Sequence, residues 1–230
     1  MNVRTTIVFS SLALIYLATL PLTPYVAQFL PKALPIVVLA VFAYTKLSAM
    51  PRYMVLAALL FSLAGDVSLA LPFADSFITG LACFFVAHLT YAMCFALLHR
   101  RLQETPGDHI ISRKPKWLIS IIMVSFAVMM AVHILPASKA LFYPVVAYIS
   151  VITLMGLTAV WLAQTKLIVT GALFFVISDA ILAQSVFKTP LPLSTIWVMT
   201  TYYGAQYCLT MGLVDGFLRK ENRQEEIGQT

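Results

Sequence analysis

The sequence predicts an all-α fold, a polytopic membrane bundle of eight transmembrane helices. Hydrophobic residues make up 61% of the 230 residues and charged residues 10%, against about 45–50% and about 25% in ordinary globular chains. The mean hydropathy is +0.91. A water-facing surface needs more charge than this, so the composition excludes a cytosolic enzyme, a disordered chain and a secreted disulfide scaffold.

Eight apolar stretches are long enough to cross roughly 30 Å of hydrocarbon. Backbone groups in lipid must form their hydrogen bonds internally, so we expect these stretches to be helices rather than open strands. Charges, prolines and short polar breaks bound them at residues 6–23, 32–48, 53–71, 77–98, 117–135, 140–163, 167–187 and 195–218.

The first two stretches differ from the other six. The first follows Arg4 and resembles a signal peptide, with small residues near Tyr25–Ala27. Seven further stretches favour an uncleaved helix, and cleavage is left open. The second stretch is short, and Pro35 lies in its expected first turn, where proline suits a helix start.

Lysine and arginine residues mark the ends of the stretches and set the orientation. Eight helices place both termini on one side, and that side holds 12 of the 15 Lys and Arg residues. The opposite side holds Lys32, Lys139 and Lys188. The positive-inside rule therefore predicts that the N and C termini are cytoplasmic. Because these charges form no single basic face, we expect no nucleic-acid partner.

The chain is predicted to form one domain, a transmembrane bundle over residues 1–218. A polar cytoplasmic loop at 99–116 and a flexible cytoplasmic tail at 219–230 are too short to fold alone. The three cysteines lie in apolar stretches without CxxC or metal-site spacing, so we expect inert thiols. Any chemistry must then lie in the helical bundle.

Two acidic residues, Asp66 in the third apolar stretch and Asp179 in the seventh, lie deep inside a stretch, whereas the others lie in loops or near helix ends. A charge in mid-bilayer costs a few kcal/mol, and such residues usually face a cavity or pathway. Asp66 lies 14 residues beyond Arg52 and Asp179 lies 13 beyond Lys166, about 20 Å in each helix at 1.5 Å per residue. Both carboxyls are thus predicted at one depth, toward the non-cytoplasmic side. The alternative is a structural pair that joins helices.

The two aspartates have similar flanking sequences, A-G-D-x-x-L-A around Asp66 and I-S-D-x-x-L-A around Asp179, where the serine is Ser178. The two stretches also have the same predicted direction. This similarity suggests an ancient duplication of a four-helix unit.

Other polar side chains are expected near the aspartates. His88 and Tyr91 share one helical face at i, i+3. The candidate pocket residues are Lys32, His88, Tyr91, Tyr148, Ser178, Tyr202, Tyr203 and Gln206. Each has a structural alternative: a buried neutral imidazole for the histidine, snorkelling to the interface for Lys32, and packing with one hydrogen bond for the others. A metal held by the aspartates and His88 is conceivable, but with one well-placed histidine we expect neither a metal nor another cofactor.

Five motifs in order resemble the YhhN-type family, which includes the lysoplasmalogenases, eight-helix membrane enzymes. They are K-A-L-P at Lys32–Pro35, S-L-A-G-D-V-S-L-A around Asp66, A-H-L-T-Y at Ala87–Tyr91, A-L-F-F-V-I-S-D-A-I-L-A around Asp179 and Y-Y-G-A-Q at Tyr202–Gln206. The resemblance implies that Asp66 and Asp179 are the catalytic residues. It also implies hydrolysis of the vinyl-ether bond of a lysophospholipid drawn from the bilayer, giving a fatty aldehyde and a glycerophospho-base.

The residue types suit that chemistry. Cleavage of a vinyl ether needs one group that holds a proton and another that is ionised, to stabilise an oxocarbenium ion and activate water. Two carboxyls in a low-dielectric pocket tend to divide in this way. Lys32 or the tyrosines could bind the phosphate head group. We expect a multi-pass integral protein of a plasma or inner membrane if bacterial, and otherwise of an endomembrane.

Two other functions compete with this interpretation. A proton-coupled transporter also needs membrane carboxyls and often carries internal repeats, although no glycine–proline interruption breaks the stretches at either aspartate. An intramembrane aspartyl protease uses two membrane aspartates as well, but the sequence after Asp179 does not follow that pattern.

Overall fold

The computed structural model describes residues 3–23, 25, 27–103, 113–163 and 165–228, and these are all-helical, as predicted. The described chain forms eight α-helices and two 3-10 turns. The helices are α1 (Val3–Thr19), α2 (Phe29–Lys46), α3 (Ala49–Ala70), α4 (Ser76–Gln103), α5 (Arg113–Ser138), α6 (Phe142–Leu162), α7 (Lys166–Phe187) and α8 (Ser194–Gly228), and the turns are η1 (Leu20–Leu22) and η2 (Lys139–Leu141).

Each predicted stretch coincides with one helix, and the main differences lie at the end of the bundle that was predicted to be cytoplasmic. Helix α8 continues to Gly228 instead of ending at residue 218, because the tail is rich in Glu, Arg and Gln, which favour helix. Helix α4 similarly extends to Gln103, into the predicted loop. Helix α5 begins at Arg113, also inside the predicted loop 99–116. Residues 104–112 of that loop lie outside the described residues. The flexibility of the tail remains a prediction.

The position of Pro35 in its helix was predicted incorrectly. Helix α2 begins at Phe29, not at residue 32, so Pro35 lies inside the helix and beyond its first turn. Pro35 has no N–H to donate to the carbonyl four residues earlier, which costs the helix one hydrogen bond. The side chain of Pro35 is buried, so packing against the bundle stabilises this segment.

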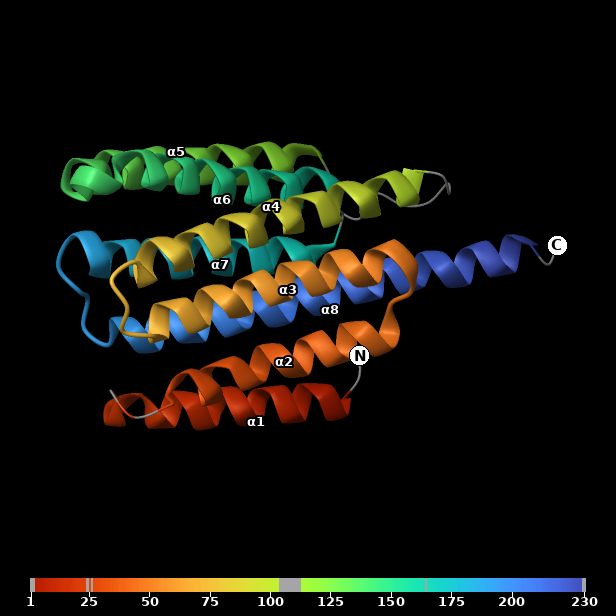
Figure 1. Cartoon of the computed structure of the whole chain (residues 1–230). Helices are drawn as coiled ribbons and strands as arrows, with labels where there is room; N and C mark the ends of the chain where they lie inside the picture. The colour runs from red at the N-terminus through yellow and green to blue at the C-terminus, as the bar shows by residue number, and fades with distance from the viewer. Residues whose placement is uncertain (1–2, 24, 26, 104–112, 164, 229–230) are drawn as a thin grey trace.

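The helices run antiparallel to their neighbours in sequence and form one elongated bundle. In Figure 1, α3, α4, α7 and α8 occupy the middle, α1 and α2 lie on one side, and α5 and α6 lie on the other. The start of α1 and the end of α8 lie at the same end of the bundle. Close pairs form between α3 and α4 and between α7 and α8.

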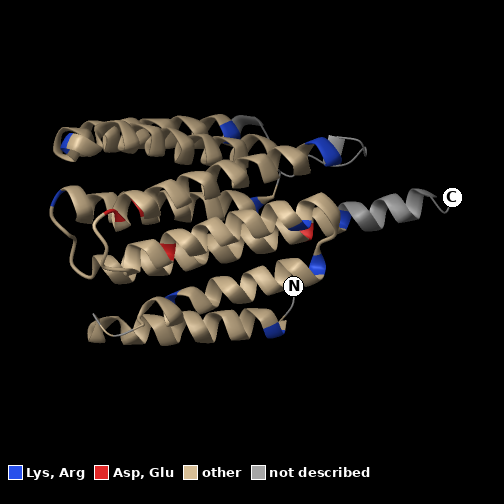
Figure 2. Ribbon diagram, in the orientation of Figure 1, with Lys and Arg blue, Asp and Glu red and all other residues tan. Residues whose placement is uncertain are grey.

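Six segments of the described chain are long and apolar enough to span a membrane, and one of them, Pro115–Leu162, combines α5 and α6. The exact number of eight crossings therefore remains a prediction. Large apolar side chains cover the outside of the bundle, for example Val132 and Ile121 on α5. Figure 2 shows most Lys and Arg residues at the end that carries the termini. This distribution fits the predicted orientation.

Glycine allows the closest helix pair in the second half of the bundle. A Cβ atom at Gly171 of α7 would lie 2.9 Å from the backbone nitrogen of Leu209 in α8. Only glycine permits the backbones to approach this closely, as in many membrane helix pairs. This packing fixes the position of α7, which carries Asp179, relative to α8, which carries Tyr202.

Candidate active site

Asp66 lies near the end of α3 in a buried, charge-paired site. Nζ of Lys32, from α2, lies 3.1 Å from Oδ1 of Asp66. The Tyr202 hydroxyl, from α8, donates a hydrogen bond of 2.6 Å to Oδ2. Asp66 is 3% exposed and Lys32 is 9% exposed. Both carboxyl oxygens are therefore occupied by donors, one of them the lysine ammonium.

Lys32 is held in place by more than the carboxylate. Its Nζ also donates to the backbone oxygen of Asp66 at 3.2 Å. The Tyr203 hydroxyl donates to the backbone oxygen of Lys32 at 2.8 Å. The predicted approach of Lys32 to a carboxylate is thus seen in the structure. The alternative, in which this ammonium extends to the membrane interface, is not.

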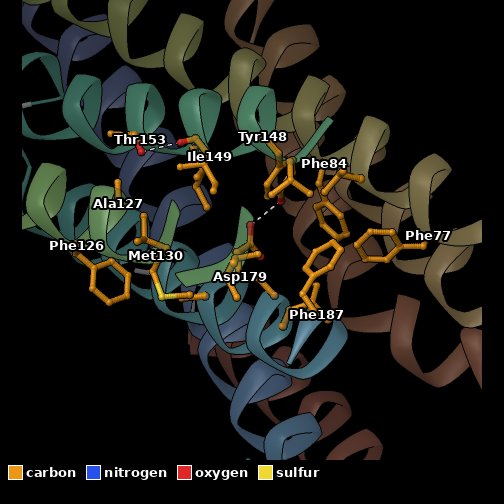
Figure 3. A pocket seen from close by; sticks show the side chains of 18 of the residues that line it. Phe77, Phe84, Phe126, Ala127, Met130, Tyr148, Ile149, Thr153, Asp179 and Phe187 are labelled. Atoms are coloured by element: carbon orange, nitrogen blue, oxygen red, sulfur yellow. Dashed lines mark hydrogen bonds between the residues drawn. The ribbon is translucent and has the colours of Figure 1, made fainter. Parts of the chain in front are cut away.

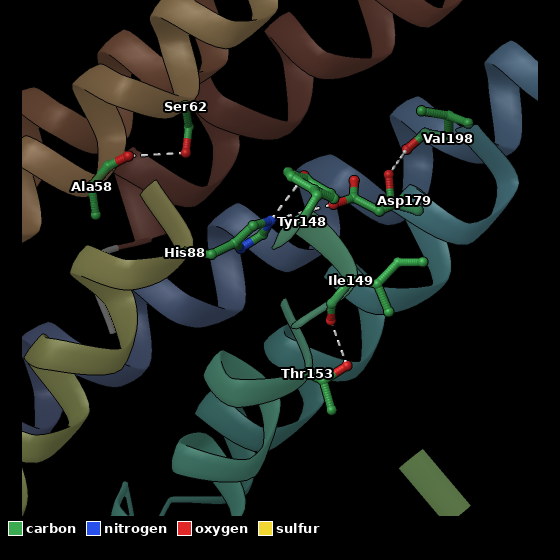
Figure 4. A network of polar contacts seen from close by, with 9 residues as sticks. Ala58, Ser62, His88, Tyr148, Ile149, Thr153, Asp179 and Val198 are labelled. Atoms are coloured by element: carbon green, nitrogen blue, oxygen red, sulfur yellow. Dashed lines mark hydrogen bonds and ion pairs between the residues drawn. The ribbon is translucent and has the colours of Figure 1, made fainter. Parts of the chain in front are cut away.

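Asp179 lies in the middle of α7 and has a different set of partners (Figure 4). The Tyr148 hydroxyl, from α6, donates to Oδ2 at 2.5 Å. Nε2 of His88, from α4, lies 3.3 Å from the same oxygen and 3.0 Å from the Tyr148 hydroxyl. Among the described residues, no Lys or Arg pairs with Asp179, and no hydrogen bond reaches its Oδ1. One oxygen of Asp179 is thus free.

The His88 ring is enclosed by its neighbours. It is fully buried and packs edge-on against Phe175, with 4.5 Å between ring centroids. No described residue bonds to Nδ1, which is buried. Nε2 lies within hydrogen-bond distance of the oxygens of both Tyr148 and Asp179, so the ring links α4 to α6 and α7.

The two aspartates line one cavity with a volume of about 380 Å³. Lys32, Ser178 and Tyr202 also line it. Polar residues near the ends of several helices form the rest of its polar wall: Tyr16, Thr23, Gln28, Ser76, Ser185, Ser194 and Thr195. Sequence reasoning did not identify these residues, because no motif marks them. The sequence signal that could have identified these residues is their position near the ends of the apolar stretches, on the side of the bundle where the aspartates are predicted.

The structure separates the other predicted pocket residues into two groups. Tyr148 lines a second, apolar pocket that also reaches Asp179. His88, Tyr91, Tyr203 and Gln206 line neither cavity and are buried behind the walls. The Tyr91 hydroxyl donates to Oε1 of Gln206 at 2.6 Å, so these two form a separate internal link between α4 and α8.

Two further contacts position the walls of the cavity. The Ser178 hydroxyl donates to the backbone oxygen of Val198 at 3.0 Å and joins α7 to α8. Gly65, beside Asp66, faces the ring of Phe84, and a Cβ atom there would lie 2.7 Å from that ring. The absence of a side chain at Gly65 therefore lets α4 approach Asp66 closely. Within the described residues, no three His, Cys, Asp or Glu side chains form a group that could hold a metal ion.

The comparison with known families agrees with the resemblance that the five motifs indicate. Residues 27–213 match the model of the YhhN family. This chain belongs to the YhhN family. The matched region contains both aspartates and every predicted pocket residue, but it begins after α1. Tyr16 and Leu20, which line the polar cavity from α1 and η1, thus lie outside the matched region of this YhhN-family chain.

Several curated relatives are similar over most of this chain. Lysoplasmalogenase TMEM86B from Homo sapiens is 34% identical over 184 residues, which cover 79% of this chain and 73% of the relative. Lysoplasmalogenase TMEM86B from Mus musculus is 30% identical over 182 residues, which cover 78% and 72%. Lysoplasmalogenase TMEM86A from Homo sapiens is 29% identical over 167 residues, which cover 68% and 63%. No solved structure matches this YhhN-family chain.

Proposed function

We propose that this protein is a membrane lysoplasmalogenase, which hydrolyses the vinyl-ether bond of lysoplasmalogens by acid–base catalysis. The observation that carries the proposal is that Asp66 and Asp179 line one cavity but have different partners. Asp66 is paired with a lysine, whereas Asp179 keeps one oxygen free. The names of the relatives support the substrate class.

The reaction needs one proton donor and one anion. Protonation of the outer alkene carbon leaves an oxocarbenium ion, and water adds to the carbon attached to oxygen. Loss of a proton from that water gives a hemiacetal, which collapses to a fatty aldehyde and the free glycerol hydroxyl. The net reaction consumes one water, and the proton taken from that water replaces the one delivered at the start. The two carboxyl groups divide these tasks as in glycosidases, which also pass through an oxocarbenium-like state.

We assign the proton-donating role to Asp179. Its Oδ2 accepts a hydrogen bond from Tyr148, which leaves Oδ1 free to carry a proton toward the cavity. Asp66 is the anion, because Lys32 and Tyr202 occupy both of its oxygens and stabilise the carboxylate. In the low-dielectric interior this fixed negative charge stabilises the oxocarbenium ion. His88 and Tyr203 position these groups from behind the cavity wall.

The test is aldehyde release from lysoplasmenyl-ethanolamine by the purified protein. We expect Asp66→Asn and Asp179→Asn each to lower the rate by about 100-fold or more, the usual contribution of a general acid or base. Asp215→Asn is the matched control, since Asp215 is exposed on α8, lines neither pocket and pairs with Arg219. Full activity in both site variants would refute the assignment of the aspartates. No aldehyde from any alkenyl lysolipid with the unaltered protein would refute the function.

A proton-coupled transporter is the second candidate, favoured by one observation. Each aspartate takes one partner from the helix before it and one from the last helix of the other half, α8 for Asp66 and α4 for Asp179. Such internal symmetry is common in transporters. However, α3 and α7 are continuous at the aspartates, whereas transporter sites typically have broken helices. Proton-driven solute uptake into liposomes without aldehyde release would favour this second function.

A further inference from the structure

We propose that the apolar pocket between α4, α5, α6 and α7 binds the single hydrocarbon chain of the lysolipid substrate. The proposal rests on the proposed function and adds the position of the chain to it. The head group and glycerol occupy the polar cavity, and the reactive double bond lies beside Asp179, where the two spaces meet.

The lining of the apolar pocket suits a hydrocarbon chain (Figure 3). Aromatic and aliphatic side chains form almost all of it, including Phe126, Met130 and Ile149. Its two hydroxyl groups are both engaged in hydrogen bonds. Thr153 donates to the backbone oxygen of Ile149, and Tyr148 donates to Asp179. No unpaired hydroxyl of this lining therefore needs a polar ligand, and the carboxyl of Asp179 is the remaining polar group.

The apolar pocket adjoins the polar cavity. Five residues line both spaces: Leu69, Phe77, Phe84, Asp179 and Leu182. In the proposed complex an amphipathic molecule occupies both spaces, with its polar part beside Lys32 and Asp66 and its chain against α5 and α6. The bond that changes in a lysoplasmalogen lies between the head group and the chain. The carboxyl of Asp179, which lines both spaces, lies at the corresponding position between the polar cavity and the apolar pocket.

The apolar lining extends along α7. The residues of α7 that line the pocket run from Val176 to Phe187, about 16 Å along the helix at 1.5 Å per residue. This length suits an extended hydrocarbon chain. Phe126, Met130 and Ala183 on the pocket wall are half-buried, so the pocket reaches the lipid-facing surface of the bundle, from which a chain can enter.

Photo-crosslinking locates the chain without using catalysis. The probe is a lysophospholipid with a saturated alkyl ether, which the reaction cannot cleave, and with a diazirine near the end of its chain. We expect adducts on Phe126, Ala127, Met130, Ile149 or Thr153, which line the apolar pocket but not the polar cavity. An excess of the same lipid without diazirine should abolish them. Adducts spread over the exposed surface, or unaffected by the competitor, would overturn the proposal.

Two neighbouring positions on α5 give a matched pair of variants. Ala127 lines the pocket, whereas Val128 is 57% exposed on the outer surface. We expect Ala127→Phe to fill the pocket and lower the ratio of cleavage of long to short alkenyl chains by about tenfold or more. Val128→Phe should leave the ratio unchanged. Phe126→Ala, which enlarges the pocket, should raise it, so a misfolded Ala127→Phe protein does not prevent the test.

The outcomes separate this proposal from the proposed function. Adducts in the apolar pocket with no aldehyde release from any alkenyl lipid would support the chain site and refute the enzymatic activity. Aldehyde release with adducts elsewhere, or with equal chain-length ratios in Ala127→Phe and Val128→Phe, would support the activity and refute the chain site.

Discussion

The ammonium nitrogen of Lys32 lies 3.1 Å from Oδ1 of Asp66, and both side chains are buried. This ion pair joins α2 to α3 inside the bundle. Asp179 has no such cation among the described residues and is held by the hydroxyl of Tyr148 and the imidazole of His88. Two carboxyls with similar flanking sequences thus have different electrostatic environments within one cavity.

The ion pair leads to a stability prediction. Lys32→Met should leave a buried carboxylate without its counter-ion and lower the free energy of unfolding by about 3–5 kcal/mol, the usual cost of breaking a buried pair from one side. The double variant Lys32→Met/Asp66→Asn should be more stable than Lys32→Met alone, because no uncompensated charge remains. Thermal unfolding in detergent measures both. A double variant less stable than Lys32→Met would contradict the ion pair as the cause.

Tyr202 should affect the reaction through Asp66. Tyr202→Phe removes the donor of the 2.6 Å hydrogen bond to Oδ2 but keeps the ring, which packs edge-on against Phe84 and Phe175. A hydrogen bond to a charged group contributes about 1.5–3 kcal/mol. We therefore expect kcat to fall by about tenfold to 100-fold in the aldehyde assay. Tyr143→Phe is the control, since Tyr143 is 81% exposed. An equal loss in both variants would indicate a general effect on the protein.

Tyr148 is expected to position Asp179. Tyr148→Phe removes the hydrogen bond to Oδ2 and the link to His88, while the ring remains in the apolar pocket. We expect kcat to fall by about tenfold or more, with little change in the affinity for the uncleavable alkyl-ether lipid. Aldehyde release and lipid binding, measured on the same preparation, separate the two effects. A parallel loss of affinity would show instead that Tyr148 shapes the binding site.

Gly65 should be intolerant of a side chain. Gly65→Ala places a Cβ atom 2.7 Å from the ring of Phe84 and must push α3 and α4 apart. Overpacking of this kind typically costs about 1–3 kcal/mol of stability. Gly65→Ala/Phe84→Leu should recover part of the loss, because leucine is smaller than phenylalanine. Thermal unfolding in detergent provides the comparison. No recovery in the double variant would mean that the ring is not the obstacle.

The family motifs identified the two aspartates. The partners of these aspartates in the structure follow the pattern that a duplication of four helices would produce. Asp66 contacts Lys32 of α2 and Tyr202 of α8, while Asp179 contacts Tyr148 of α6 and His88 of α4. If α1–α4 and α5–α8 are repeats, these are equivalent positions in exchanged halves. The duplication itself remains a prediction, which the flanking similarities and the equivalent contacts support.

The sequence by itself determined the membrane class, the helices and the two carboxyls inside the apolar stretches. Hydropathy fixes these features because an apolar segment in lipid must be helical, and a charge inside it is costly enough to be conspicuous. It left open whether Lys32 extends to the interface, and it placed Tyr91 and Gln206 with the candidate pocket residues. Sequence patterns report the face and depth of a residue on its own helix, but not which helix packs against that face.

Only the tertiary structure decided these partners. Packing of α2 and α8 against α3 pairs Lys32 with Asp66, and packing of α4 against α8 turns Tyr91 toward Gln206, behind the cavity wall. The apolar pocket beside Asp179 had no sequence signal, because its side chains resemble any other apolar residues of a membrane helix. A cavity is the space left between elements far apart in the chain, so it exists only once the helices are packed.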